Sequence, residues 1–224
     1  MTRSEEVAQE IAFWDLALGQ NRPDLEQRAK PMRWGEACPA EVVELVRPML
    51  QDHRVPLVLD VGCGPLSQIA YVQAIGAHLI GLDELAQPYK ALLELHGIRP
   101  NCLMLPVSID EELGEPALFM GRADLVWMRN ALDHVYAPGI AFANLVTLLS
   151  PRGVLVIGGF LNEGKRQNYQ GMHQIDIWVE PDNTLWYQRH GSPPVAFDTS
   201  GFDVELRSAV QVNWFQAIIR RHVE

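Results

Sequence analysis

The C-terminal half of the sequence offers three side chains that could take a proton from a reacting hydroxyl group. His134 follows one apolar segment, and Glu163 and His173 follow the next. An imidazole titrates near neutrality and a buried carboxylate can be brought there, so both groups suit general acid–base chemistry. We expect His134 to be the catalytic base, with Glu163 and His173 as alternatives. The competing interpretations are a loop cap or cofactor contact for His134 and a solvated loop for the other two.

The same segments could bind a metal ion. Asp133 and Asn162 would add oxygen ligands to His134, Glu163 and His173. Carboxylates, amides and imidazoles are all common metal ligands. The spacing matches no fixed ligand motif, however. The sequence-based prediction is therefore that no metal is bound, and a metal site stays an alternative.

A glycine-rich turn in the N-terminal half could hold an anionic or hydroxyl-rich cofactor. An apolar run with Asp60 near its end is followed by Gly62, Cys63 and Gly64. Glycine permits positive φ angles and lets the backbone approach a ligand closely. A helix expected directly after the turn would aim free N–H groups into the same space. A second apolar run further along the chain ends in Asp83.

These side chains need a sheet whose strands end at one edge. Strand-like and helical segments alternate through the middle of the chain, which is typical of a parallel, doubly wound sheet. Ligands of such sheets bind at the carboxyl ends of the strands, so we expect the glycine turn and the loop of His134 at this edge. The expected strands lie at about 56–61, 77–83, 102–107, 123–128 and 153–159, and the expected helices at about 4–19, 40–50, 66–75, 88–95 and 138–149.

Two kinds of nucleotide cofactor are compatible with the glycine turn. Dinucleotide-binding turns follow the pattern G-x-G-x-x-G, but no third glycine is present where Gln68 or its neighbour stands. The pattern Asp60-x-Gly62-x-Gly64 instead resembles motif I of the class I S-adenosylmethionine-dependent methyltransferases. Further segments resemble later motifs of that family in the same order, and together they span about residues 55 to 160. These segments are residues 78–83, 123–134 and 149–157.

The resemblance implies that S-adenosylmethionine is the cofactor. An NAD-dependent Rossmann oxidoreductase and a non-catalytic S-adenosylmethionine-binding module that contacts a protein partner are the alternatives. The cofactor-binding residues expected from the resemblance are Asp60, Gly62, Cys63, Gly64, Asp83, Glu84, Ser108, Ile109, Asp110, Met128, Arg129 and Asn130.

The segments around the three candidate bases are similar to methyltransferases of bacterial glycan or secondary-metabolite pathways. The segments are residues 130–134, Asn162-Glu163 and residues 169–174. This similarity implies O-methylation of a sugar-like or other small polar acceptor. No residue in these segments fixes the acceptor atom.

Composition limits the partners that we expect. The chain has 224 residues, a formal net charge of -10 and three widely spaced cysteines. Nucleic-acid-binding proteins usually carry a basic patch, which is absent from this sequence, so we expect a small-molecule substrate and no nucleic acid. The cysteines form neither a zinc pattern nor a disulfide framework, and no apolar run is long enough for a membrane span. We therefore expect a cytoplasmic protein without membrane contact.

The predicted architecture is α/β: a Rossmann-like, doubly wound sheet of seven strands, mostly parallel with the last strand antiparallel. A helical cap precedes the sheet, and a β-hairpin is inserted late in the chain, because two alternating segments flank the turn at residues 181–183. The whole chain is expected to form one domain. Its parts are the cap (1–52), the cofactor-binding core (53–160), the inserted loop and hairpin (161–191) and the closing strands (192–224).

Aromatic residues of the cap and the hairpin could contact the acceptor. N-terminal additions often cover the active site in the resembling family, while core packing is the competing interpretation. Hairpin aromatics could stack on a sugar or aryl ring, although inter-strand packing or a homodimer surface would also explain them. The lid candidates are Phe13, Trp14, Arg33 and Trp34, and the hairpin candidates are Trp178, Trp186 and Tyr187.

Overall fold

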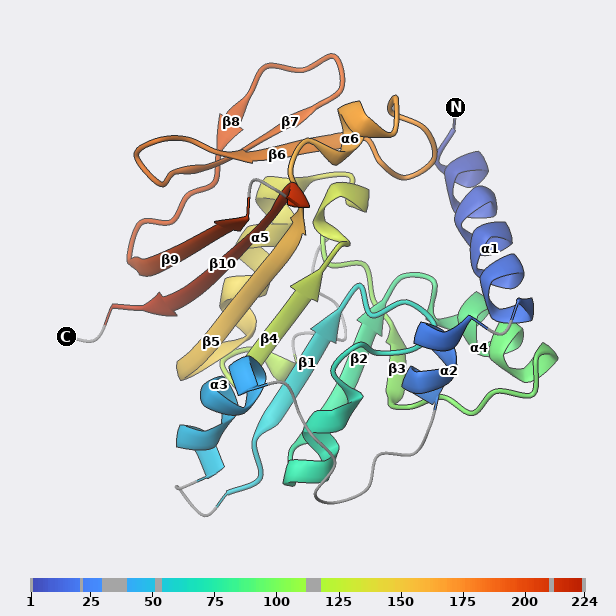
Figure 1. Ribbon diagram of the computed structural model, residues 1–224. Coiled ribbons are helices and arrows are strands. Elements are labelled where there is room, and N and C mark those ends of the chain that lie inside the picture. The colour runs from blue at the N-terminus through green and yellow to red at the C-terminus, as the bar shows by residue number, and fades with distance from the viewer. Residues whose placement is uncertain are drawn as a thin grey trace.

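The computed structural model describes residues 2–20, 22–29, 40–50, 54–111, 118–209 and 212–222. A seven-stranded sheet forms its centre, with the strand order β3-β2-β1-β4-β5-β10-β9 (Figure 1). β10 pairs antiparallel with both of its neighbours, while the other pairs are parallel, as predicted. The strands are β1 (Leu57–Val61), β2 (His78–Asp83), β3 (Leu103–Pro106), β4 (Ala123–Arg129), β5 (Leu149–Phe160), β9 (Phe202–Ala209) and β10 (Trp214–Arg221).

Successive residues of the central strands face opposite layers of helices. In β1, Val58 belongs to a buried cluster with Val46 of α3 (Ala40–Leu50). Its neighbour Leu59 belongs to a second buried cluster with Leu145 of α5 (Pro138–Leu148). Burial on both faces accounts for the continuous apolar character of the strand sequences.

A third buried cluster attaches the N-terminal helices to the sheet. It joins Leu18 of α1 (Arg3–Gly19) and Leu25 of α2 (Pro23–Ala29) to Leu93 of α4 (Ala86–Leu95). Figure 1 shows α1 beside α4, near the ends of β1 and β2. A helical cap is thus present, but the lid candidates Arg33 and Trp34 lie outside the described residues.

The prediction of a helix over residues 66–75 is wrong in its extent. Only a short 3₁₀ helix, η1 (Ala70–Ile75), forms there, and the preceding residues are a loop. The backbone of Ser67 is tied to a distant side chain, because its N–H donates to Asn101 Oδ1 and its carbonyl accepts from Asn101 Nδ2, both at 2.9 Å. The expected helix N-terminus therefore does not form beside the glycine turn.

The insertion after β5 forms a small second sheet. The predicted hairpin pairs β6 (Ile175–Val179) with β7 (Leu185–Arg189), and a third strand that was not predicted, β8 (Val195–Ala196), pairs with β7. A single helical turn, α6 (Glu163–Arg166), precedes the hairpin. Ile175 and Leu185 are buried in the same cluster as the main sheet, so the insertion packs on the core.

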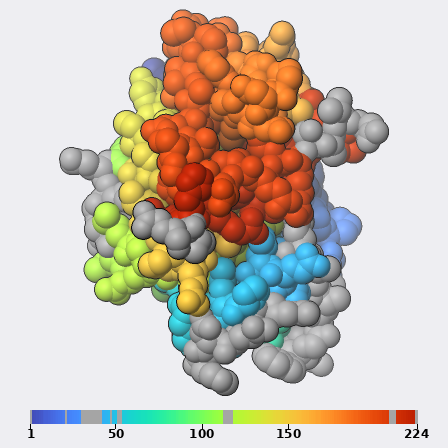
Figure 2. All heavy atoms as spheres, turned by 90° about the vertical axis from the view of Figure 1, so that its left-hand side faces the viewer, coloured from blue at the N-terminus to red at the C-terminus, as the bar shows by residue number. Residues whose placement is uncertain are grey.

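The far edge of the main sheet lies at the surface. Figure 2 shows this edge, where β9 and β10 lie between the insertion above and α3 below.

Among the described residues, no helix combines the length and the apolar character that a membrane span requires.

Candidate active site

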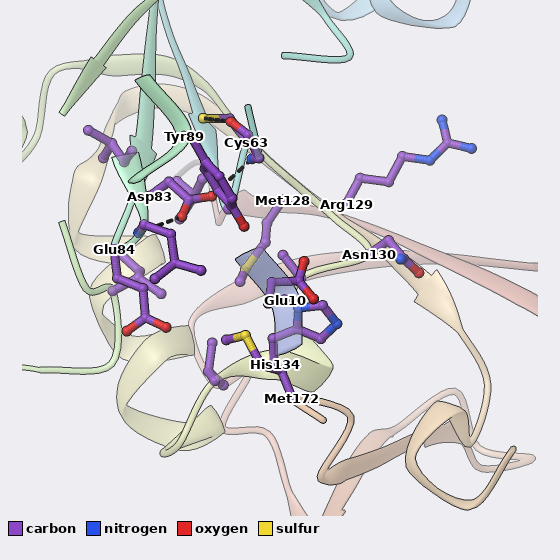
Figure 3. Close-up of a pocket in the computed structure, with 18 of the residues that line it drawn as sticks. Glu10, Cys63, Asp83, Glu84, Tyr89, Met128, Arg129, Asn130, His134 and Met172 are labelled. Atoms are coloured by element: carbon purple, nitrogen blue, oxygen red, sulfur yellow. Dashed lines mark hydrogen bonds between the residues drawn. The ribbon is translucent and has the colours of Figure 1, made fainter. Parts of the chain in front are cut away.

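A cavity of about 320 Å³ opens at the carboxyl ends of β1, β2 and β4 (Figure 3). Its wall brings together the glycine turn, the ends of β2 and β4, one face of α1 and the residues just before β6. Every predicted cofactor-binding residue lines it except Asp60. Of the predicted catalytic residues, His134 and His173 line it and Glu163 does not.

The glycine turn packs closely against neighbouring side chains, and at Gly62 a side chain would not fit. Gly62 and Gly64 have φ angles of 65° and 63°, which favour glycine. A Cβ atom on Gly62 would lie 2.4 Å from the Cβ of Ala131, and one on Gly64 would lie 3.4 Å from the ring of Trp14. Trp14, a predicted lid residue, therefore covers the turn from the side of α1.

Asp83 joins the end of β2 to the glycine turn. Its two carboxylate oxygens accept hydrogen bonds from the N–H groups of Gly64 and Leu85, both at 2.9 Å. Burial raises the pKa of this carboxyl, although the two N–H donors oppose that effect. Each oxygen keeps a second acceptor site for a hydroxyl group of a ligand.

Asp60 lies beneath the turn and outside the cavity wall. Its carboxylate is buried and accepts a hydrogen bond of 2.5 Å from the hydroxyl of Ser67. Burial raises its pKa to about 7. These contacts favour a structural role for Asp60, which supports the loop that carries the glycine turn.

Glu84 reaches the cavity wall but is already paired. The guanidinium of Arg3 on α1 hydrogen-bonds to its carboxylate and also donates to the carbonyl oxygen of His134, at 3.1 Å. Arg3 thus links α1 to the loops that follow β2 and β4.

Asp110 caps the start of α5. Its carboxylate accepts hydrogen bonds from the N–H groups of Tyr136 and Ala137 and from the hydroxyl of Ser108. These donors occupy the carboxylate, and the same segment offers the apolar side chains of Val107 and Ile109 to the cavity.

Asn130 has the best-placed unpaired polar atom of the cavity. Its backbone is left-handed, with φ 54°, and its amide oxygen is buried without a hydrogen-bond partner among the described residues. Met128 lies beside it on the wall. Arg129 extends away from the other labelled residues (Figure 3), and its guanidinium lies 4.7 Å from the ring centroid of Trp214.

The two histidines of the cavity wall meet at one buried carboxylate. Asp133 and His134 lie on the 3₁₀ turn η3 (Leu132–His134), which follows β4, and His173 lies before β6. Asp133 Oδ2 is 2.6 Å from His173 Nδ1 and 3.5 Å from His134 Nε2, and the two imidazole nitrogens are 3.2 Å apart. From the sequence, Asp133 was a candidate only as a metal ligand, because its contact with His173 depends on the fold.

Opposite influences act on the protonation of this cluster. Burial alone would raise the pKa of Asp133, but the charge of His134 and the hydrogen bond from His173 lower it below its ordinary value. Burial alone would lower the pKa of His173, but the hydrogen bond and charge of Asp133 raise it. Both shifts favour an ionised Asp133 carboxylate beside a protonated His173.

Glu163 is buried behind the cavity wall. Its carboxylate oxygens accept hydrogen bonds from Arg166 Nη1 and Gln167 Nε2, each at 2.8 Å. With both oxygens engaged inside the turn of α6, Glu163 contacts no cavity space and is not in a position to take a proton from a ligand there.

Glu10 is a cavity residue that the sequence reasoning missed. It lies on α1 and accepts a hydrogen bond of 2.8 Å from the indole N–H of Trp14. It lines the cavity, and its charge raises the pKa values of Asp83 and His173. The available signal was its position one helical turn before a predicted lid residue, on the same face of the helix. Tyr89 and Met172 also line the cavity without having been predicted.

The hairpin aromatics pack within the insertion. The rings of Trp178 and Trp186 stack with centroids 6.3 Å apart, and Tyr187 contacts Phe197 at 4.6 Å. None of the three predicted residues lines the cavity. Inter-strand packing therefore accounts for them.

Comparisons with known proteins agree with this architecture. The family described as "Methyltransferase domain" matches residues 59–157. The trans-aconitate 2-methyltransferase of Escherichia coli O17:K52:H18 (strain UMN026) is 29% identical over 177 residues, which cover 71% of this chain and 60% of that protein. The chain thus spans about 60% of the length of this curated relative.

Two solved structures share the fold at low sequence identity. The trans-methyltransferase CalH in complex with SAH gives a TM-score of 0.53 at 19% identity, over 81% of this chain and 56% of that chain. The CurJ carbon methyltransferase gives a TM-score of 0.53 at 13% identity, over 85% of this chain and 57% of that chain. The sheet and its flanking helices are therefore shared with methyltransferase structures.

Proposed function

Because the chain belongs to the class I S-adenosylmethionine-dependent methyltransferase family, we propose that it transfers the methyl group of S-adenosylmethionine to a small molecule. The observation that carries this proposal is the cavity at the carboxyl ends of β1, β2 and β4, which combines a glycine turn with an acid at the end of β2. Ligand sites of open α/β sheets lie at this edge.

The residues of the cavity suit this cofactor. Gly62 and Gly64 would let the backbone approach it, and Asp83 would accept hydrogen bonds from ribose hydroxyl groups. The unpaired amide oxygen of Asn130 would accept a hydrogen bond from the ammonium group of the cofactor. The bound cofactor would supply a methyl carbon already activated by its sulfonium, so the protein mainly has to align an acceptor.

The acceptor proposed is a small, polar hydroxyl compound of sugar-like character, methylated on oxygen. The His134–His173–Asp133 cluster supports this choice, because a hydroxyl acceptor must lose a proton and the cluster lies on the cavity wall. His134 is the residue proposed to take that proton, and His173 can replace or assist it. Glu163 affects the cluster only from behind the wall.

A carboxylic acid is the second candidate acceptor. Arg22 and Arg28 line the cavity, where both pair with Asp24, and arginine binds carboxylates well. The name of the Escherichia coli relative points to a carboxylic acid as well. A carboxylate acceptor is already deprotonated, so its methylation would not need His134.

Calorimetry with S-adenosylhomocysteine and with NAD tests the cofactor. We expect S-adenosylhomocysteine to bind and Asp83→Asn to weaken that binding, while Asp182→Asn on the exposed turn between β6 and β7 leaves it unchanged. Binding of NAD alone would instead favour an oxidoreductase.

A methyl-transfer screen over sugars, phenols, carboxylic acids and amines tests the activity. Turnover of a hydroxyl compound is the expected result. Tight cofactor binding without turnover of any acceptor, together with a co-purifying protein, would favour a non-catalytic binding module.

A further inference from the structure

Three potential ligand atoms converge beside the cavity, and one pair of them, Asp133 Oδ2 and His173 Nδ1, shares a short hydrogen bond. His173 Nδ1 lies 2.6 Å from Asp133 Oδ2, so the proton of that nitrogen belongs to this hydrogen bond. His134 Nε2 lies 3.2 Å from the same nitrogen. If both imidazole nitrogens carry a proton, both N–H groups have to share Asp133 Oδ2, which lies 3.5 Å from His134 Nε2 and is therefore beyond ordinary hydrogen-bond distance.

The spacing of these atoms suits ligands of one metal ion. Zinc bonds to histidine nitrogen and carboxylate oxygen are about 2.0 to 2.2 Å long, so two ligands of one ion lie roughly 3 to 3.5 Å apart. The separations between His134 Nε2 and the other two atoms, 3.2 and 3.5 Å, fall in this range. The shorter separation, between Asp133 and His173, would have to widen by a few tenths of an ångström on binding, on the same bond lengths.

The protein holds these groups from two separate segments. Asp133 is buried on η3, and the backbone N–H of His134 donates to the carbonyl oxygen of Ala131. The N–H of His173 donates to the carbonyl oxygen of Gln170, directly before β6. Glu10 brings a further carboxylate to the same cavity (Figure 3). The surroundings are therefore both anchored and negatively charged.

We propose that Asp133, His134 and His173 bind one divalent transition-metal ion on the cavity wall. Two imidazoles and a carboxylate form a ligand set suited to ions such as zinc, cobalt or iron(II). This site departs from the sequence-based prediction, which found no metal motif because the two histidines come from different loops.

The open coordination positions of the ion would face the cavity and take an acceptor oxygen. This role rests on the proposed function, whereas binding of the ion does not. In the metal-bound protein the ion would replace His134 in the role of activating the acceptor: coordination would lower the pKa of an acceptor hydroxyl, whose proton would pass to water. The oxygen would then bond to the methyl carbon as the carbon–sulfur bond breaks, and the electron pair of that bond would stay on sulfur.

Cobalt binding tests the site directly, in the absence of cofactor and acceptor. Tag-free full-length protein is treated with a chelator, dialysed and titrated with Co²⁺ while its visible absorption is recorded, and Zn²⁺ is then added. We expect one Co²⁺ per chain, with ligand-field bands that Zn²⁺ abolishes. His134→Ala, His173→Gln and Asp133→Asn should each weaken binding by about 100-fold or more, since even outer-shell changes cost 10- to 100-fold.

The matched control is a histidine–carboxylate pair outside the cavity. His96 lies 2.8 Å from Asp15 at the surface, and His96→Ala should leave Co²⁺ binding unchanged. Absence of bound Co²⁺ in folded protein, or binding that survives all three cluster substitutions, would overturn the proposal. Near-ultraviolet circular dichroism and S-adenosylhomocysteine calorimetry on each variant separate loss of the site from loss of the fold. They also keep this test distinct from that of the cofactor.

Discussion

The two halves of the cavity are built in different ways. The half proposed to bind the cofactor, called the cofactor half below, is defined mainly by backbone geometry: Gly62 and Gly64 lie at positive φ, and Asp83 accepts a hydrogen bond from the N–H of Gly64. The half proposed to bind the acceptor, called the acceptor half below, is assembled from side chains on α1, η3 and the segment before β6. Its central contact, between His134 and His173, joins residues 39 positions apart. Substitutions should therefore separate the two halves, with cofactor affinity responding to one and turnover to the other.

The largest effect is expected from His134→Ala. Loss of the proposed proton acceptor should lower turnover of a hydroxyl acceptor by about 10²- to 10⁴-fold, which is the usual contribution of acid–base catalysis. S-adenosylhomocysteine affinity should hardly change, because the imidazole belongs to the acceptor half. Steady-state kinetics and calorimetry provide the two measurements, with His190→Ala on the insertion as the control.

Two other results for His134→Ala would contradict the proposed division of the cavity into a cofactor half and an acceptor half. If S-adenosylhomocysteine binding falls while turnover at saturation stays the same, His134 serves the cofactor. If neither quantity changes, a carboxylate acceptor that needs no base becomes the preferred substrate class.

Gly62→Ala should damage the cofactor half. The new methyl group would lie 2.4 Å from the Cβ of Ala131. The alanine would also have to adopt the left-handed backbone conformation that Gly62 has. Displacing a turn by about 1 Å can cost on the order of 10²-fold in function, and we expect a loss of that order in S-adenosylhomocysteine affinity.

Gly76→Ala controls for the backbone effect alone. Gly76 also has a positive φ angle, but nothing lies within 4 Å of the position that its Cβ would take. The substitution should therefore lower the free energy of unfolding by about 1 to 2 kcal/mol and leave S-adenosylhomocysteine binding intact. Equal affinity losses in the two variants would show that strain, and not the close packing of the turn, explains the Gly62 result.

Arg3→Ala should produce a smaller effect on both halves. Arg3 pairs with Glu84 and donates to the carbonyl oxygen of His134, so it connects the halves through α1. Both partners of the ion pair are about one-third exposed, and such pairs contribute roughly 0 to 1 kcal/mol. We expect cofactor affinity and turnover to fall a few-fold together. Arg207→Ala, which removes the exposed pair with Glu205 on β9, should change neither.

The same contrast explains what the sequence could predict. The strands and the β6–β7 hairpin follow from local patterns of apolar and turn residues, and their order follows from the rules of parallel sheets. The glycine turn is likewise a local signal. The helix expected at residues 66–75 was wrong because Asn101, far along the chain, binds the backbone of Ser67. Local patterns do not carry that information.

The acceptor half depends on such distant contacts throughout. The sequence identified His134 and His173 as separate candidates, but their shared contact with Asp133 appears only in the fold. Glu10 reaches the cavity from a helix that precedes the sheet. Glu163 had the right residue type in the right loop, yet its carboxylate is bound to Arg166 and Gln167.

The smallest predicted effect concerns Asp60, which the sequence assigned to the cofactor and the structure places beneath the turn. Burial raises its pKa from 3.8 to about 7. The folded state therefore binds a proton more tightly than the unfolded state, and stability should decline as the pH rises from about 4 to about 7. Asp60→Asn removes this titration, so the variant should gain stability relative to the wild type across that window, as measured by urea midpoints at several pH values.

Asp182→Asn is the control for this pH window. Asp182 accepts hydrogen bonds from Thr184 that lower its pKa, so it does not titrate between about pH 4 and 7. S-adenosylhomocysteine affinity of the Asp60→Asn variant should stay within a few-fold of the wild type, because Asp60 does not line the cavity. Stability curves of wild type and variant that run parallel over the window would contradict the raised pKa. A large loss of S-adenosylhomocysteine affinity in a stable Asp60→Asn variant would instead show that Asp60 contributes to cofactor binding.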